Sequence, residues 1–212
     1  MTAPTTTMNR VIHAAVRRDL DRLAAALGDL ADGDRPRAQA LERAFANLRL
    51  ELTHHHEGED THIWPMCATV GIDKGLLEAM ESEHHLMAEA LADTSAAMAT
   101  VASTGAAADA ATAYASVVHT REVVERHLRH EEAELEPALS PHFESPEWKA
   151  VEKKLRSQPP GVAGRFFAWI TDGMSDDHRA FLKKTVPTPV VTVLARVFGR
   201  RYYRDIAPVW KS

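Results

Sequence analysis

Residues 53–66 read THHHEGEDTHIWPM, and this stretch decides the fold. Four histidines and three carboxylates crowd into it within an alanine-rich chain. His55, Glu59 and His62 follow one another at helical spacing, so they share one face of a helix. Because burying an unpaired charge costs several kcal/mol, these side chains are expected to meet partners in the core. The same face continues an apolar stripe, formed by Leu41, Phe45, Leu48 and Leu52.

Three other stretches before about residue 140 show the same helical periodicity. The sequences DGDRP and STG break the chain between helices, and Pro65 and Pro137 are expected to end two of them. Four helices with short connections predict an all-α, up-down-up-down four-helix bundle over residues 1–156.

A histidine, glutamate and proline motif occurs twice, 72 positions apart: His55, Glu59 and Pro65 recur as His127, Glu131 and Pro137. The upstream histidines His13 and His84 are 71 positions apart, which indicates a duplicated helical hairpin. His85 also fits the repeat, but only His84 lies on the apolar stripe of its helix. Isolated hydrogen bonds in the core explain such repetition poorly, so the pattern favours one shared site.

Counting residues from the turns places the four histidines at one level of the bundle. His13 and His55 lie about 18 residues from the turn that joins their helices, or roughly 27 Å. His84 and His127 lie about 20 residues from the STG turn, or roughly 30 Å. Each carboxylate of the repeat lies one turn beyond its histidine. The pattern predicts a metal centre with six ligands: His13, His55, Glu59, His84, His127 and Glu131.

The types of ligand narrow the choice of metal. Mixed imidazole and carboxylate donors suit iron, manganese or zinc, and the single Cys67 cannot supply a thiolate cluster. Six protein ligands exceed those of one tetrahedral zinc. Two ions about 3.5 to 4 Å apart, bridged by Glu59 and Glu131, would use all six. Such a pair leaves positions for a bridging oxygen and a small external ligand.

These residues and their order resemble the hemerythrin-like, or HHE cation-binding, family. The resemblance rests on His13 and on the motifs HHEGEDTHIWP, EHHLM and HLRHEEAELEP, and it covers residues 9 to about 140. It implies a four-helix bundle with a non-heme di-iron centre. In that centre the six residues named above would hold two oxo- or hydroxo-bridged iron ions, which take a small diatomic or peroxide ligand.

Two departures from the oxygen carriers of this family bear on function. Carriers have a second histidine four residues after the first on the third helix, where this chain has Ala88. In the last helix, carriers have an acid five residues after the histidine, whereas in this chain both Glu131 and Glu132, four and five residues after His127, are acidic. A metal centre more open than that of a carrier favours reaction with hydrogen peroxide, dioxygen or nitric oxide. We therefore expect an oxidoreductase that disproportionates peroxide or reduces nitric oxide. The alternatives are an oxygen-binding or oxygen-, redox- or iron-sensing module without turnover, and a structural metal protein.

Two further side chains are candidates for catalytic proton transfer. His62 and Glu134 each lie seven residues after a histidine of the repeat, so both are expected to face inward. The simpler interpretation is an ion pair at the end of the bundle. A ferritin-like centre would instead use Glu-x-x-His motifs, which start here at Glu59 and Glu81, but the last helix lacks one.

Residues 157–212 are expected to form a helical extension that packs on the bundle and covers its metal end. Their apolar runs FFAWI and PVVTVLARVF are too short to span a membrane, so membrane contact is not expected. The basic, aromatic end GRRYYRDIAPVWK is a candidate surface for a protein partner. A net charge of -5 does not favour binding to nucleic acid. The single cysteine and the lack of a signal peptide predict a cytoplasmic protein.

Overall fold

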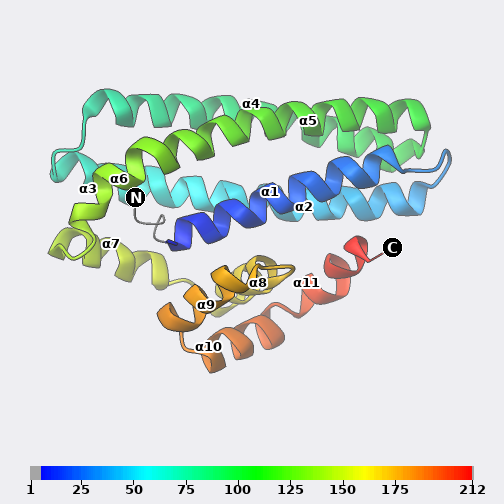
Figure 1. The fold of residues 1–212 in the computed structure, drawn as a ribbon. Helices are drawn as coiled ribbons and strands as arrows, with labels where there is room; N and C mark the ends of the chain where they lie inside the picture. The colour runs from blue at the N-terminus through cyan, green and yellow to red at the C-terminus, as the bar shows by residue number, and fades with distance from the viewer. Residues whose placement is uncertain (1–5, 212) are drawn as a thin grey trace. The chain divides into compact units, whose positions relative to one another are not determined.

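The computed structural model describes residues 6–211, which form helices and no β-strand (Figure 1). The all-α expectation is therefore confirmed. The chain divides into a central unit, residues 23–157, and a terminal unit, which combines the residues up to Arg22 with those from Gln158 onward. Helix α1 (Met8–Gly28) begins in the terminal unit and ends in the central unit. The up-down-up-down order of four helices and the expected domain boundary stay predictions.

Three long helices build the central unit: α2 (Arg35–Gly58), α4 (Lys74–Thr104) and α5 (Ala107–His130). α2 packs against α4, and α4 packs against α5. Figure 1 shows α4 and α5 as an antiparallel hairpin. At its turn Gly105 has a φ of 70°, and a Cβ there would lie 2.8 Å from the backbone nitrogen of Arg35. The turn therefore requires glycine, as the STG sequence predicts.

Aspartate caps fix the starts of α2 and α4. Asp34 accepts a hydrogen bond from the backbone N–H of Arg37, and Asp73 accepts one from that of Leu76. The stripes predicted from the sequence then supply buried apolar residues, which are Leu41, Phe45, Leu48, Leu52, Met80, Met87, Leu91, Val117 and Val124.

A π-helical turn begins at each glutamate of the 72-residue repeat. These turns are η1 (Glu59–Ile63) and η2 (Glu131–Leu135). After each, a backbone N–H bonds the carbonyl oxygen five residues back: that of Trp64 bonds Glu59, and that of Glu136 bonds Glu131. The repeat seen in the sequence is thus also a repeat of backbone geometry.

The expectation that Pro65 and Pro137 end their helices is wrong. α3 (Trp64–Thr69) and α6 (Glu136–Leu139) follow the π turns directly. Each proline stands in the first turn of the new segment, where its missing N–H removes no helical hydrogen bond. The π turn has shifted the hydrogen-bond register, so the chain stays helical through the proline.

A second apolar cluster forms around these segments and the two elements that follow, η3 (Ser140–His142) and α7 (Pro146–Arg156). Its buried members are Trp64, Met66, Cys67, Met80, Leu135, Leu139 and Val151. The cluster joins α3, α6 and α7 to the start of α4, next to the two π turns.

Short helices build the terminal unit: α8 (Pro160–Thr171), α9 (Asp176–Thr185), α10 (Thr188–Val193), η4 (Leu194–Phe198), α11 (Arg200–Asp205) and η5 (Ala207–Trp210). The π-helical segment η4 packs against α8. No helix among the described residues has the length and apolar character needed to cross a membrane.

Buried polar contacts tie the start of α1 to the rest of the terminal unit. Asp19 is 1% exposed and accepts hydrogen bonds from the indole N–H of Trp169 and from Nε of Arg18, both at 2.8 Å. The hydroxyl of Tyr202 donates to Asp172 at 2.8 Å. Buried Trp169 and Tyr202 therefore both have polar partners, which explains why residues distant in sequence form one unit.

Gly164→Ala is expected to destabilise the terminal unit. Its Cβ would lie 2.4 Å from Cβ of Phe198 and 2.5 Å from the carbonyl oxygen of Leu194, where α8 meets η4. Overpacking of this kind costs about 1–3 kcal/mol, and urea titration should show that loss in the free energy of unfolding. Gly161→Ala on the same helix is the control, because nothing lies within 4 Å of its Cβ. Equal effects of the two substitutions would contradict the close packing.

Candidate metal centre

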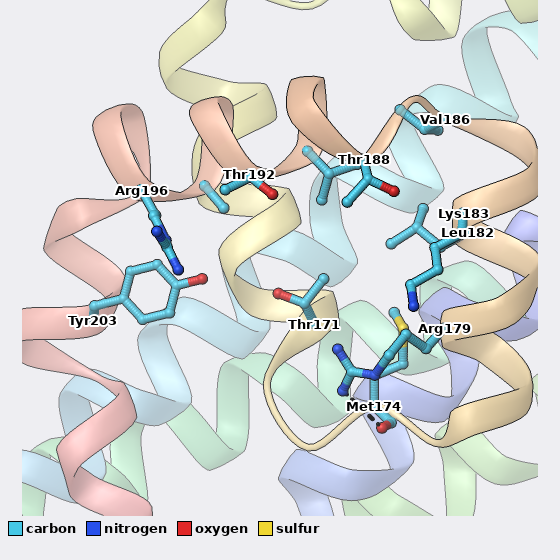
Figure 2. A pocket seen from close by; sticks show the side chains of 12 residues that line it. Thr171, Met174, Arg179, Leu182, Lys183, Val186, Thr188, Thr192, Arg196 and Tyr203 are labelled. Carbon is cyan, nitrogen blue, oxygen red and sulfur yellow. Dashed lines mark hydrogen bonds between the residues drawn. The ribbon is translucent and has the colours of Figure 1, made fainter.

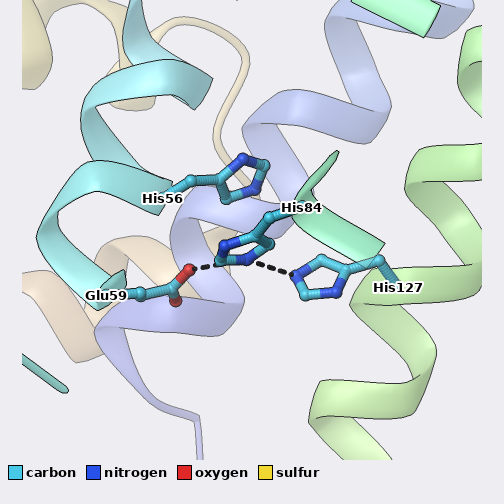
Figure 3. A group of neighbouring side chains, drawn as sticks. All are labelled: His56, Glu59, His84 and His127. Atoms are coloured by element: carbon cyan, nitrogen blue, oxygen red, sulfur yellow. Dashed lines mark hydrogen bonds and ion pairs between the residues drawn. The ribbon is translucent and has the colours of Figure 1, made fainter. Parts of the chain in front are cut away.

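Four buried side chains converge in the central unit: His56, Glu59, His84 and His127 (Figure 3). Each offers one ligand atom, and these atoms all lie within 4.8 Å of one another. The end of α2 and the start of η1 supply the first two, and α4 and α5 supply one each. Imidazole nitrogens and a carboxylate oxygen are donors that suit iron, manganese or zinc, so this group could hold a metal ion.

The Nε2 atoms of two histidines face each other in this group. Nε2 of His84 lies 3.2 Å from Nε2 of His127 and 3.5 Å from Oε2 of Glu59. The ring of His56 stacks on that of His84, with centroids 4.2 Å apart. The potential ligand atoms therefore border one small volume of the core.

A carboxylate holds each of the two facing imidazoles from behind. Nδ1 of His84 bonds Asp60 at 2.8 Å, and Nδ1 of His127 bonds Glu83 at 3.0 Å. Because a carboxylate only accepts, each ring donates its Nδ1 proton, and a ring in its neutral form then has its lone pair on Nε2. Burial lowers the pKa of His127 and so favours that neutral form. When both rings are neutral, their two Nε2 lone pairs repel at 3.2 Å unless a proton or a metal ion lies between them.

The carboxylate of Glu59 is poorly satisfied in the chain alone. Glu59 is 1% exposed, and Glu131 nearby is also buried. Burial raises the pKa of Glu59 well above its ordinary value, and the charge of Glu131 raises it further. Its Oε1 lies 3.3 Å from Nε2 of His55, but neither oxygen receives a hydrogen bond from the described residues. A multivalent cation fits this donor set, because it would compensate both carboxylates.

The single cysteine lies in the apolar cluster near these carboxylates. Cys67 is fully buried, and burial raises the pKa of its thiol to about 12, with a further contribution from the charge of Glu131. The thiol therefore stays protonated, and the donors available for a metal are imidazoles and carboxylates, as the sequence predicts.

The structure brings five of the six predicted ligands into the central unit: His55, Glu59, His84, His127 and Glu131. His13 is buried on α1 in the terminal unit, so its part in the centre stays a prediction from the sequence. The side chain of Glu81 is exposed, so the second motif of a ferritin-like centre does not reach the core. The metal-binding roles themselves stay predictions.

Glu134 does not face inward as expected, because its side chain is 63% exposed and lies 3.6 Å from Nε2 of His130. His62 is half-buried. Both residues lie within π turns, which place an extra residue in the turn. Side chains after the first residue of each turn therefore rotate away from the face that α-helical spacing predicts. The catalytic roles of His62 and Glu134 stay predictions.

Three residues around the centre are not predicted from the sequence: His56, Asp60 and Glu83. Helical spacing places His56 about 100° from the face that carries His55, so the sequence predicts that it points away from the core, but the structure buries it four residues after Leu52. The two acids directly neighbour predicted ligands in sequence, but each bonds a histidine on a different helix. That pairing depends on how the helices pack, and no local pattern shows it.

Comparison with known protein families finds a match over most of the chain. A family model described as the hemerythrin HHE cation-binding domain matches residues 7–139. That range contains η1, η2 and every residue of the candidate metal centre. No curated protein and no solved structure matches the chain.

Glu83→Gln is expected to weaken metal binding roughly 10- to 100-fold, because an amide orients the imidazole of His127 less firmly than a carboxylate does. Competition with a chelator measures the affinity. Glu81→Gln is the matched control, two residues earlier on α4 and exposed, and it should change nothing. Equal affinities of Glu83→Gln and the wild type would exclude Glu83 from the site.

Glu59→Gln is expected to stabilise the metal-free protein at neutral pH by about 1–3 kcal/mol, because it removes a buried charge. The folded-state pKa of Glu59 is raised, so wild-type stability falls as pH rises above the ordinary value of 4.5. The gain should therefore vanish in acid, where the native carboxyl holds its proton.

Urea unfolding in chelator across this pH range measures the effect of Glu59→Gln. Comparison with wild type at each pH isolates Glu59 from His127, whose lowered pKa gives the opposite slope in both proteins. A variant less stable than wild type in chelator at neutral pH would show that the carboxylate is already well compensated in the chain.

Proposed function

The chain belongs to the hemerythrin HHE cation-binding domain family, and on this premise we propose that its His/Glu cluster holds two iron ions and detoxifies hydrogen peroxide or nitric oxide. The observation that carries the proposal is the facing pair of Nε2 atoms of His84 and His127, 3.2 Å apart beside Glu59. A cation is the group that this arrangement would bind most favourably.

The number of donors favours two ions over one. The central unit offers six candidate ligands: His55, His56, Glu59, His84, His127 and Glu131. A single tetrahedral ion would use four of these residues, whereas two ions would use the whole set. The mutual effect of these two buried carboxylates supports this, since the charge of Glu131 raises the pKa of Glu59.

Bound iron would supply Lewis acidity and exchangeable electrons to a small oxidant. The chain itself supplies a dry setting. Trp64 stacks against His84, with ring centroids 5.6 Å apart, and belongs to the apolar cluster that includes Cys67 and Leu135. This wall keeps bulk water from one side of the site and so strengthens electrostatic interactions within it. Ala88, four residues after His84, offers no donor atom and is exposed, so His84 is the histidine that α4 supplies to the site.

A chain of polar contacts runs from the centre toward solvent. One oxygen of Glu83 bonds Nδ1 of His127, and the other bonds Nδ1 of His130 at 2.8 Å. The side chain of His130 is 25% exposed, and its Nε2 lies 3.6 Å from Glu134. Conversion of two peroxide molecules to dioxygen and water moves protons without net gain or loss. Because Nε2 of His127 would bind a metal ion, we propose that Glu83 orients this ring, and that His130 and Glu134 at the outer end of the chain exchange protons with solvent.

Iron content and peroxide turnover of the full-length protein test the proposal. Iron-loaded protein should carry about two iron ions per chain and should evolve dioxygen when peroxide is added. His84→Ala should lose both properties. His85→Ala is the matched control, because His85 is the exposed neighbour on α4, and it should keep both.

Three results would each contradict a different part of the proposed function. Protein without stoichiometric transition metal would refute the proposal as a whole. Iron-loaded protein that ignores both peroxide and nitric oxide, yet forms a stable azide or oxygen complex, would refute detoxification and favour sensing or oxygen binding. Equal loss of activity in His84→Ala and His85→Ala would show that the geometry in Figure 3 is not the reacting centre.

A further inference from the structure

The terminal unit contains a pocket of about 270 Å³ between α9, α10, η4 and α11 (Figure 2). Three cationic side chains line it: Arg179 and Lys183 on α9, and Arg196 on η4. Figure 2 shows the first two on one wall, and Arg196 with Tyr203 on the opposite wall. No carboxylate belongs to the lining.

These three cations lack the acidic partners that other basic residues of the unit have. Within residues 6–211, none of them pairs with a carboxylate, and the guanidinium of Arg179 bonds only the carbonyl oxygen of Met174, at 3.3 Å. By contrast, Arg22 pairs with Asp172. Like charges around one pocket repel, and a bound anion would offset that repulsion.

Hydroxyl groups add neutral donors to the same pocket. Thr188, Thr192 and Tyr203 line it, and their hydroxyls form no hydrogen bond with other described residues. Apolar side chains, among them Leu182 and Val186, complete the lining. The pocket thus combines positive charge, hydroxyl donors and an apolar surface, which are the features that bind the charged and carbon parts of a small organic anion.

We propose that this pocket binds the phosphate group of a small phosphate monoester. Such a group carries about -1.5 to -2 charges and three strong acceptor oxygens, which matches three cations and several hydroxyl donors. A carboxylate brings one charge and two oxygens, and would leave part of this donor set unused. The pocket is smaller than the roughly 300–1,000 Å³ of sites for drug-sized ligands, so the ester is small.

Two sources offer this chemistry, a soluble ester and the headgroup of a phospholipid. Three exposed apolar side chains support the lipid source. Val190, Val193 and Val197 are 45%, 55% and 54% exposed on the continuous helical run of α10 and η4. Exposed apolar side chains beside a cationic pocket are typical of segments that rest on a lipid surface. The experiment therefore includes an arm for each source.

Calorimetric titration of the full-length protein with inorganic phosphate and with phenyl phosphate, at constant ionic strength, tests the pocket. Arg179→Gln and Arg196→Gln should each weaken binding roughly tenfold, as the loss of a charge-assisted hydrogen bond predicts. Lys183→Gln should act in the same direction. The matched controls are Lys184→Gln and Arg200→Gln, which remove the same charges from exposed positions outside the lining and should change affinity less than about twofold.

Co-sedimentation with vesicles separates the two sources. Binding to phosphatidic acid vesicles that free phosphate competes away assigns the headgroup, and phosphate binding without co-sedimentation assigns the soluble ester. The proposal is overturned if phosphate binding does not saturate, or if the control substitutions weaken it as much as the pocket substitutions do. Circular dichroism of each pocket variant and each control variant checks that the protein stays folded.

Discussion

The central unit buries potential ligand atoms that face one another, and its fold has to accommodate them in the core. Nε2 of His84 and Nε2 of His127 lie 3.2 Å apart in the core, next to a carboxylate that receives no hydrogen bond from the described residues. In a dry interior such groups repel or stay unsatisfied, and each costs several kcal/mol without compensation. The packing of α2, α4 and α5 nevertheless holds them together. Positive charge in the space between these groups would offset their repulsion and compensate the carboxylate.

The backbone adapts to this constraint in the same way twice. π turns begin at Glu59 and at Glu131, and π turns inside helices are frequent at functional sites. Each turn begins with a buried carboxylate, and in the second turn Glu134 lies away from the core. The register shift also allows the helical path to continue through Pro65 and Pro137. One local distortion thus connects the 72-residue repeat, the position of the two acids and the apolar cluster beyond them.

Helical periodicity was enough to predict the all-α class, the hairpin turn at Gly105 and the buried stripes, because each depends on local spacing or on one special residue. Repetition was enough to single out His55, Glu59, His127 and Glu131. Periodicity failed where the helix itself departs from α-helical spacing, and so it misplaced Glu134.

Packing between distant segments left no local signal in the sequence. The hydrogen bonds of Asp60 and Glu83 to histidines on other helices are of this kind. So is the contact of Asp19 with Trp169, 150 positions away, which joins the start of α1 to the C-terminal helices. Sequence spacing therefore predicted Glu59, His84 and His127 of this cluster, while His56 and the acids that bond the histidines required the structure.

Anomalous diffraction at the iron edge, from crystals of the iron-loaded full-length protein, tests whether iron binds at this cluster. Strong anomalous density is expected within bonding distance of Nε2 of His84, Nε2 of His127 and the carboxylate of Glu59. Iron density elsewhere, or its absence from this position in iron-loaded crystals, would contradict iron binding at this cluster.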